Sequence, residues 1–176
     1  INYVQMGYYD KAREIFECVE SMEKMGQELT RYQKLACRLS TAEIEINIGN
    51  TCRAMEIIDK ILELEPSNHT CRDLAEIHKL KAKAHVKMGN YQDAEKEFES
   101  SYNYCMKKTL IYARCNILLE WAKLYLHTEE FHKAINFLKE VIEIGSLNKF
   151  NVAVRESYYL LYIIYKKENI FDLALN

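Results

Sequence analysis

The sequence predicts an all-α protein made of stacked pairs of antiparallel helices, and three observations support this fold class. First, only 5 Gly and 1 Pro occur among 176 residues, which is fewer turn-forming residues than a β-sandwich or a loop-rich enzyme needs. Second, a short motif recurs along the chain at a nearly constant spacing. Third, the apolar residues between its copies follow the period of an amphipathic helix.

The recurring motif is a turn followed by an alanine early in the next helix. Its copies occupy residues 6–12, 48–54, 88–94 and 128–134, and a weaker copy occupies 169–174. The alanines are separated by 42, 40, 40 and 40 residues, and they are Ala12, Ala54, Ala94, Ala134 and Ala174. Such regularity indicates internal repeats, each of which is one helix pair.

Each position of the motif has a physical interpretation. Glycine takes the left-handed conformation that ends a helix without a steric penalty, and the motif places it at Gly7, Gly49 and Gly89. An aromatic residue two positions later is expected to pack back across the turn; these are Tyr9, Tyr91, Phe131 and Phe171. The alanine lets the second helix approach the first, and an apolar residue follows four positions later, on the same face, at Phe16, Ile58, Phe98 and Leu138.

The periodicity predicts the position of every helix. The first helices of the pairs are expected at 33–48, 72–88, 111–127 and 152–167, and the second helices at 9–25, 51–64, 91–106 and 131–145. We expect breaks after second helices at Gly26, Pro66 and Gly145, and N-caps at Thr70 and Asn151. The prediction is a single repeat domain over residues 1–176, about four 40-residue repeats long, with both ends inside a repeat. Because the first residue is Ile1, we expect a piece of a longer protein.

Composition and charge exclude several classes of function. The net charge is −2, with 24 Lys+Arg against 26 Asp+Glu, so this segment itself is a poor nucleic-acid binder. No apolar run approaches the ~18 residues of a membrane span, and no signal peptide is visible. We therefore predict a cytoplasmic protein that does not enter a membrane.

The six cysteines form no C-x-x-C pair and are expected to be small buried residues in a reducing compartment.

No motif for catalysis, for a cofactor or for a metal is present. The phosphate-binding, dinucleotide-binding, zinc-protease and serine-hydrolase signatures do not occur. The strongest metal candidate is the row Cys71, His78 and His85. Seven residues of helix rise by about 10.5 Å, so these side chains do not converge on one ion. We predict that the chain is not an enzyme and holds no cofactor or metal.

The residues carry a family resemblance. Ala-x-x-x-Phe occurs at 12–16 and 94–98 with Gly-x-Tyr before each, and small residues stand twelve positions before three of the turn alanines, at Ala42, Ala82 and Ala122. The whole chain resembles the tetratricopeptide repeat (TPR) family. It departs from that family in its period, which is 40 rather than ~34 residues, in Glu129 at the glycine position of the copy at 128–134, and in lacking most prolines. HEAT-type repeats share the longer period, but the Gly-x-Tyr-x-x-Ala turn favours the TPR assignment.

This resemblance implies a right-handed superhelix (an α-solenoid) of antiparallel helix pairs that binds peptides or proteins. Long units of this kind resemble those of bacterial peptide-pheromone receptors and related helix-turn-helix regulators, and the bias towards Ile, Lys, Asn and Tyr is typical of an AT-rich bacterial genome. We therefore expect the sensing and oligomerisation domain of a bacterial transcriptional regulator, which forms homo-oligomers. The alternative is a scaffold or adaptor domain that has no peptide effector.

The resemblance also implies where a ligand binds. In the family, the first helices line a concave groove, and transferring that face by repeat register gives the candidate peptide-binding residues Asn47, Lys79, Lys83, Lys87, Asn116, Lys123, Tyr159 and Lys166. The same transfer places Leu39, Glu43, Leu119, His127, Glu156 and Ile163 on this face. The lysines suit an acidic or carboxylate-ended peptide, and the asparagines suit its backbone. The alternative is that these lysines are ordinary solvated surface groups.

Overall fold

The structure is a computed structural model that describes residues 29–64 and 68–168, together with positions 9, 10, 13, 14, 17, 21 and 25. Seven helices and no strand occur in this described part of the chain. They are α2 (Arg31–Ile48), α3 (Thr51–Leu64), α4 (Cys71–Met88), α5 (Tyr91–Lys107), α6 (Ile111–His127), α7 (Phe131–Asn148) and α8 (Asn151–Lys167). The all-α prediction is confirmed. Most of the helix expected at 9–25 lies outside the described residues, as do Gly7, Ala12, Phe16, Cys18, Gly26, Pro66, Phe171 and Ala174.

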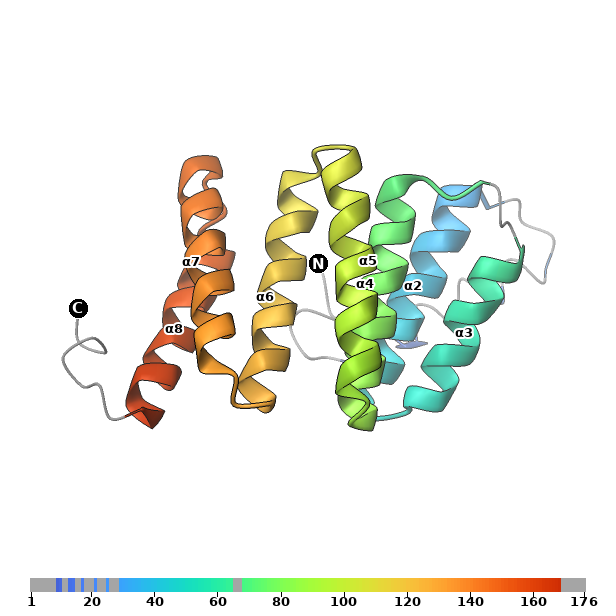
Figure 1. The fold of residues 1–176 in the computed structure, drawn as a ribbon. Helices are drawn as coiled ribbons and strands as arrows, with labels where there is room; N and C mark the ends of the chain where they lie inside the picture. Colours follow the sequence, from blue (N-terminus) through green and yellow to red (C-terminus); the bar gives the residue numbers. More distant parts are fainter. Residues whose placement is uncertain are drawn as a thin grey trace.

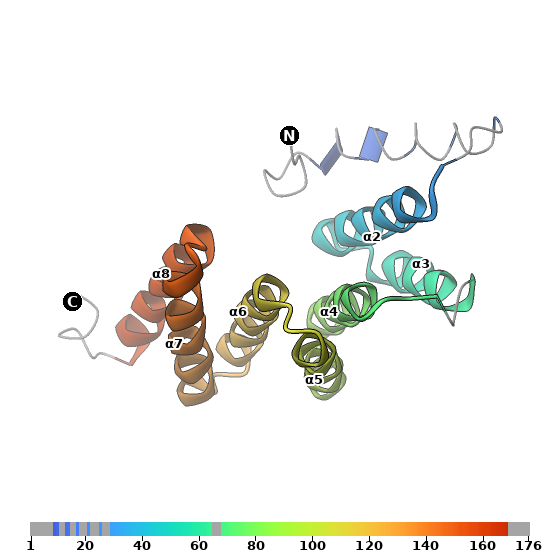
Figure 2. The same ribbon diagram turned by 90° about the horizontal axis from the view of Figure 1, so that it is seen from above.

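The helices form an α-solenoid of antiparallel pairs. Helix α2 packs on α3, α4 on α5, and α6 on α7, while the first helices α2, α4, α6 and α8 also contact one another in sequence (Figure 1). Figure 2 shows that the row of pairs curves, with α2, α4, α6 and α8 on its inner side and α3, α5 and α7 on its outer side. The repeat register therefore brings equivalent residues of the four first helices onto one surface.

Local sequence explains where the helices begin and end. Thr70 caps α4 as predicted: its hydroxyl accepts a hydrogen bond from the Asp73 amide, and the Asp73 carboxylate accepts one from the Thr70 amide. Gly49 and Gly89 end α2 and α4 at φ of 93° and 78°, the left-handed conformation that the motif predicts. Glu129 occupies the same register at φ 60°, so the third turn keeps this geometry without glycine.

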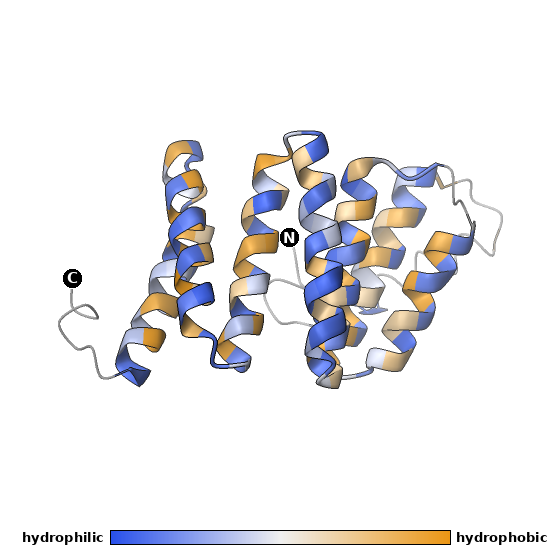
Figure 3. Cartoon of the chain, in the orientation of Figure 1, coloured by the Kyte–Doolittle hydropathy of each residue, from blue (hydrophilic) through white to orange (hydrophobic). Residues whose placement is uncertain are grey.

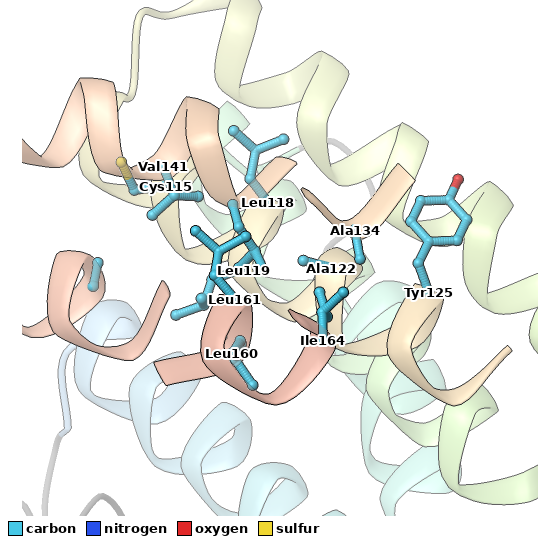
Figure 4. Close-up of a cluster of buried hydrophobic side chains, with 12 residues drawn as sticks. Cys115, Leu118, Leu119, Ala122, Tyr125, Ala134, Val141, Leu160, Leu161 and Ile164 are labelled. Carbon is cyan, nitrogen blue, oxygen red and sulfur yellow. The ribbon is translucent and has the colours of Figure 1, made fainter. Parts of the chain in front are cut away.

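The core repeats one feature in each helix pair, a fully buried alanine on each of the two helices. Ala42 and Ala54 share one buried cluster, Ala82 and Ala94 a second, and Ala122 and Ala134 a third, and all six are 0% exposed. Figure 4 shows the third pair among leucines of α6 and α8. Ile58, Phe98 and Leu138 are buried as predicted. Each helix carries distinct apolar and hydrophilic faces (Figure 3), so burial of one face against its neighbours drives the stacking.

Several expectations about individual residues need correction. Phe131 packs on the core, whereas Tyr91 at the same register is 40% exposed. Cys52 is exposed on α3, although Cys37, Cys105 and Cys115 are buried. Asn151 is the first residue of α8 rather than its cap, because Phe150 takes the N-cap position. Cys71 is half-buried.

Gly145 does not end α7, which continues to Asn148 before Lys149 turns left-handed at φ 60°. The glycine is buried where α7 approaches α8, and a Cβ added to it would lie 2.6 Å from Val154 Cγ2. Its role is therefore close packing between helices rather than termination. None of the described helices is long and apolar enough to cross a membrane.

We expect Ala94→Glu to destabilise the fold severely. The substitution forces a charge and extra volume into a contact that is 0% exposed, which costs about 3 kcal/mol or more. Urea denaturation of wild type and variant measures this loss. A melting temperature within a degree or two of wild type would show that Ala94 is not at a close helix contact.

Gly145→Ala is expected to destabilise by about 1–2 kcal/mol, because overpacking against Val154 outweighs the gain in helix propensity. The matched control is the same substitution in a Val154→Ala background, where the obstructing methyl is gone. There Gly145→Ala is expected to stabilise by about 0.5–1 kcal/mol. Equal effects in both backgrounds would contradict a steric role for the glycine.

Candidate functional site

Two stripes of polar residues face the inner side of the solenoid. On α4 the stripe is Glu76, Lys79, Lys83 and Lys87, and on α6 it is Asn116, Glu120, Lys123 and His127. Offsets of three or four, seven and eleven residues keep side chains on one face of a helix. Because α4 and α6 are in contact, the two stripes lie next to each other.

A pocket of about 290 Å³ opens where the C-terminal halves of α2, α4 and α6 meet, and we call it pocket A. Its polar lining residues are Asn47, Lys83, Lys87, Glu120, Lys123 and His127. Its apolar lining residues are Ile46, Val86, Phe98 and Leu124. Four of the eight predicted peptide-binding residues, namely Asn47, Lys83, Lys87 and Lys123, thus line one pocket with contributions from three first helices.

Most of the predicted lysines are held in ion pairs. Lys83 Nζ lies 3.0 Å from Glu43 Oε1, which joins α4 to α2. Lys123 Nζ lies 2.7 Å from a carboxylate oxygen of Glu120 and 2.7 Å from one of Glu156, which joins α6 to α8. We call Glu43, Lys83, Glu120, Lys123 and Glu156 the ion-pair ladder. These lysines are therefore neither free to attract an acidic ligand nor simply solvated.

The ladder also determines how its groups titrate. Burial alone would raise the pKa of Glu120, but the ammonium groups of Lys123, Lys83 and Lys79 hold it below its usual value. Burial alone would lower the pKa of Lys123, but Glu120 and Glu156 hold it above its usual value. Both groups are thus charged near neutral pH, and their charges compensate each other.

The remaining predicted residues lie in different surroundings. Lys79 is mostly buried and paired with Glu76 at 2.7 Å, and burial opposed by Glu76 leaves its pKa above the usual value. Lys87 is exposed at the edge of pocket A. Asn116 lines a second pocket of about 490 Å³ near the other end of α4 and α6, which we call pocket B. Tyr159 and Lys166 are exposed on α8 and line neither pocket.

Repeat register did not identify five residues of pocket A, namely Ile46, Val86, Phe98, Glu120 and Leu124. Glu120 stands four residues after Asn116, so its place on the stripe was visible in the spacing. The residues one period before and after Glu120 are Leu80 and Leu160. The equivalent position is therefore apolar in the neighbouring repeats, and register does not indicate a polar residue there. Phe98 was assigned only to the core, yet it also lines the pocket from α5.

An aromatic cluster adjoins pocket A. The rings of Phe98 and Trp121 stack with their centroids 6.0 Å apart, and Trp121 also packs on Tyr125 and Phe137. Trp121 is the single tryptophan of the sequence. Its fluorescence therefore reports on events at Phe98, in the pocket lining.

The arrangement is suited to binding by apolar contact, hydrogen bonds and charge. Among the described residues, no group of three or more His, Cys, Asp or Glu side chains is placed to hold a metal ion. Of the histidine row, His78 Nδ1 lies 2.6 Å from Glu97 Oε2, which links α4 to α5. This pair lines neither pocket, and it strengthens the packing of the second repeat.

We expect Glu120→Gln to cost about 1–2 kcal/mol of unfolding free energy at pH 7, because Glu120 loses its charge-assisted bond to Lys123. The pKa of Glu120 in the folded state lies below its ordinary value of 4.5. Its ionised form therefore stabilises the fold above that pH, and this contribution disappears as the pH falls through the folded-state pKa.

Urea denaturation between pH 7 and pH 3 tests this sign. The difference in unfolding free energy between wild type and Glu120→Gln is expected to shrink below about pH 4.5. Glu99→Gln, at an exposed position on α5, is the control, with a small difference at every pH. A wild-type advantage that is constant with pH would contradict the role of the ladder.

The chain resembles known proteins in its fold. No family model and no curated protein matches it. Aspartyl phosphate phosphatase F from Bacillus subtilis superposes with a TM-score of 0.81 at 18% identity, over 96% of this chain and 45% of that one. BtubC from P. vanneervenii superposes with a TM-score of 0.72 at 15% identity, over 94% and 67% of the two chains. A kinesin light chain of Podospora anserina with TPR-like repeats superposes with a TM-score of 0.65 at 20% identity, over 98% and 84%.

The chain spans less than half the length of the phosphatase that it matches. At these identities the likeness concerns the fold, and it agrees with the alanine contacts and left-handed turns described above. The chain has the fold of a TPR-like α-solenoid.

Proposed function

We propose that the chain is a module that binds a peptide or a protein segment in pocket A. The observation that carries this proposal is the convergence of α2, α4, α5 and α6 on one pocket with a mixed apolar and charged lining. Concave pockets with apolar walls and a few placed polar groups are the usual ligand sites of proteins. The predicted residues Asn47, Lys83, Lys87 and Lys123 all belong to it.

The lining favours a ligand that joins an apolar group to an acidic group. Val86 is partly exposed and provides apolar contact area, whereas Ile46, Phe98 and Leu124 are buried in the pocket lining. Because Lys83 and Lys123 are occupied by glutamates, the acidic group is expected at Lys87. An acidic side chain or a terminal carboxylate of the peptide fits this position.

In its finer form, the proposal is that residues 1–176 form one repeat domain that senses a peptide and oligomerises within a bacterial cytoplasmic transcriptional regulator. The resemblance to long TPR units of such regulators and the fold match to a Bacillus subtilis protein support it. No catalytic step is assigned to this chain, and the phosphatase name belongs to the matched protein alone.

A scaffold or adaptor domain is the second candidate, and the ion-pair ladder favours it. Paired charges make most of the groove close to neutral, which suits a broad protein surface as well as a small acidic effector. The two candidates differ in the response of the oligomeric state. Light scattering of the protein should show a change of mass on peptide binding for a sensor and no change for a scaffold.

We expect Lys87→Glu to weaken peptide binding more than tenfold with little change in melting temperature. Lys87 is exposed and is the one pocket-A lysine that forms no ion pair among the described residues, so its reversal replaces attraction by repulsion without removing a structural contact. Reversal of Lys83 is a poorer test because the new carboxylate would face Glu43.

The measurement uses hexapeptides selected from a random-sequence library on the wild-type protein, with Trp121 fluorescence as the readout. Binding should weaken with added salt, since exposed charges are screened over ~8–10 Å. Lys139→Glu, at an exposed position on α7, is the matched control and should bind as wild type. Equal affinity of Lys87→Glu and wild type would rule out ligand binding at pocket A.

A further inference from the structure

Pocket B is the larger of the two pockets, and only Asn116 of the predicted residues lies in it. It is formed by the N-terminal parts of α4 and α6 and by the turns that lead into α6 and α8. Glu76 and Asn116 line it on the groove side, and Tyr112 and Phe150 contribute aromatic rings. Nothing in the proposed function requires this pocket.

The two pockets lie on the same pair of stripes. Glu76 in pocket B and Lys87 in pocket A share the α4 stripe, and Asn116 and His127 share the α6 stripe. Each stripe covers eleven residues between these ends. At 1.5 Å per residue the pockets are separated by about 16 Å along the helices. An extended chain covers that distance in about five residues.

Among the described residues, the part of the two stripes between Glu76 and Lys87, including the inner wall of pocket A, offers no free charge. Lys79 and Lys83 are only 13% and 18% exposed, and both are paired with glutamates. Glu120 is compensated by Lys123. A ligand that crosses this surface is therefore held at its two ends rather than at its centre.

Pocket B has the chemistry to hold one such end. Tyr112 is 58% exposed and meets Phe150 edge to face, with the centroids 5.2 Å apart. These rings present apolar area at low cost in conformational entropy. The side-chain NH2 group of Asn148 donates a hydrogen bond to the Ile144 carbonyl. The side-chain oxygen of Asn148 can then accept a hydrogen bond from a peptide N–H. An apolar side chain and the adjoining backbone of an extended peptide fit this lining.

We propose that pocket B is a second subsite for the same ligand. This inference rests on the proposed function. The ligand is an extended peptide of at least five residues that lies parallel to α4 and α6. It places one apolar side chain in each pocket and an acidic group at Lys87.

The test uses Tyr112→Ala and Tyr158→Ala. Both tyrosines are 58% exposed, but Tyr158 lies on α8 and lines neither pocket, so it controls for loss of an exposed ring. The probes are the hexapeptides selected on wild type, together with versions shortened by three residues from either end. Affinities are measured by Trp121 fluorescence and checked by calorimetry.

We expect Tyr112→Ala to weaken hexapeptide binding about tenfold or more, and Tyr158→Ala to leave it unchanged. One of the two shortened peptides should lose all sensitivity to Tyr112→Ala while remaining sensitive to Lys87→Glu. This pattern places the ends of one peptide in the two pockets.

The other outcomes distinguish the two proposals. If Lys87→Glu weakens hexapeptide binding but Tyr112→Ala does not, pocket A is a ligand site and the second subsite is refuted. The same holds if shortened peptides bind as tightly as hexapeptides. If no library peptide binds wild type, or if Lys87→Glu has no effect, the proposed function itself fails and the second subsite fails with it.

Discussion

The fully buried alanines of each helix pair are the constraint on which the rest of the structure depends. Ala82 and Ala94 share one buried cluster and Ala122 and Ala134 another, and such small side chains permit the two helices of a repeat to approach closely. Successive pairs then stack in register, and the first helices line up along the inner side. The groove is thus a consequence of small residues that lie outside it.

The same stacking determines the electrostatics of the groove. Glu43 and Lys83 stand one period apart on neighbouring first helices and form an ion pair, while Lys123, one period after Lys83, is compensated by Glu120 and Glu156. Partly buried charges are costly unless they are paired, so the ladder favours one alignment of α2, α4, α6 and α8. It also removes most of the positive potential that a row of lysines suggests. In the proposed function, recognition therefore relies on the ends of the stripes, where the two pockets lie.

Much of the fold could be predicted from sequence because its determinants are local. The turn glycines, the Thr70 cap and the helical period each act within a few residues. The error at Gly145 concerns a contact between helices, because this glycine lies against Val154 of α8. That contact is not encoded by spacing within one helix.

The candidate site was predictable in part for the same reason. Register identified the face and four residues of pocket A. It did not identify the pairs Lys83–Glu43 and Lys123–Glu156, because these depend on distances between helices. A signal for the first pair was nonetheless present, since Glu43 and Lys83 have opposite charge and stand one period apart. Comparing charges at one-period separation therefore identifies this pair, as comparison along a single helix does not.

That comparison also explains why the free positive charge is at Lys87. The residues one period before and after it are Asn47 and His127, and neither is an acid that can neutralise an ammonium group. One turn earlier on α4, Lys83 has Glu43 at the equivalent position of α2. Lys87 lies in the last turn of α4, where a cation also stabilises the negative end of the helix dipole. That interaction stabilises the helix end but does not bury the ammonium group. Lys87 therefore remains exposed at the edge of pocket A.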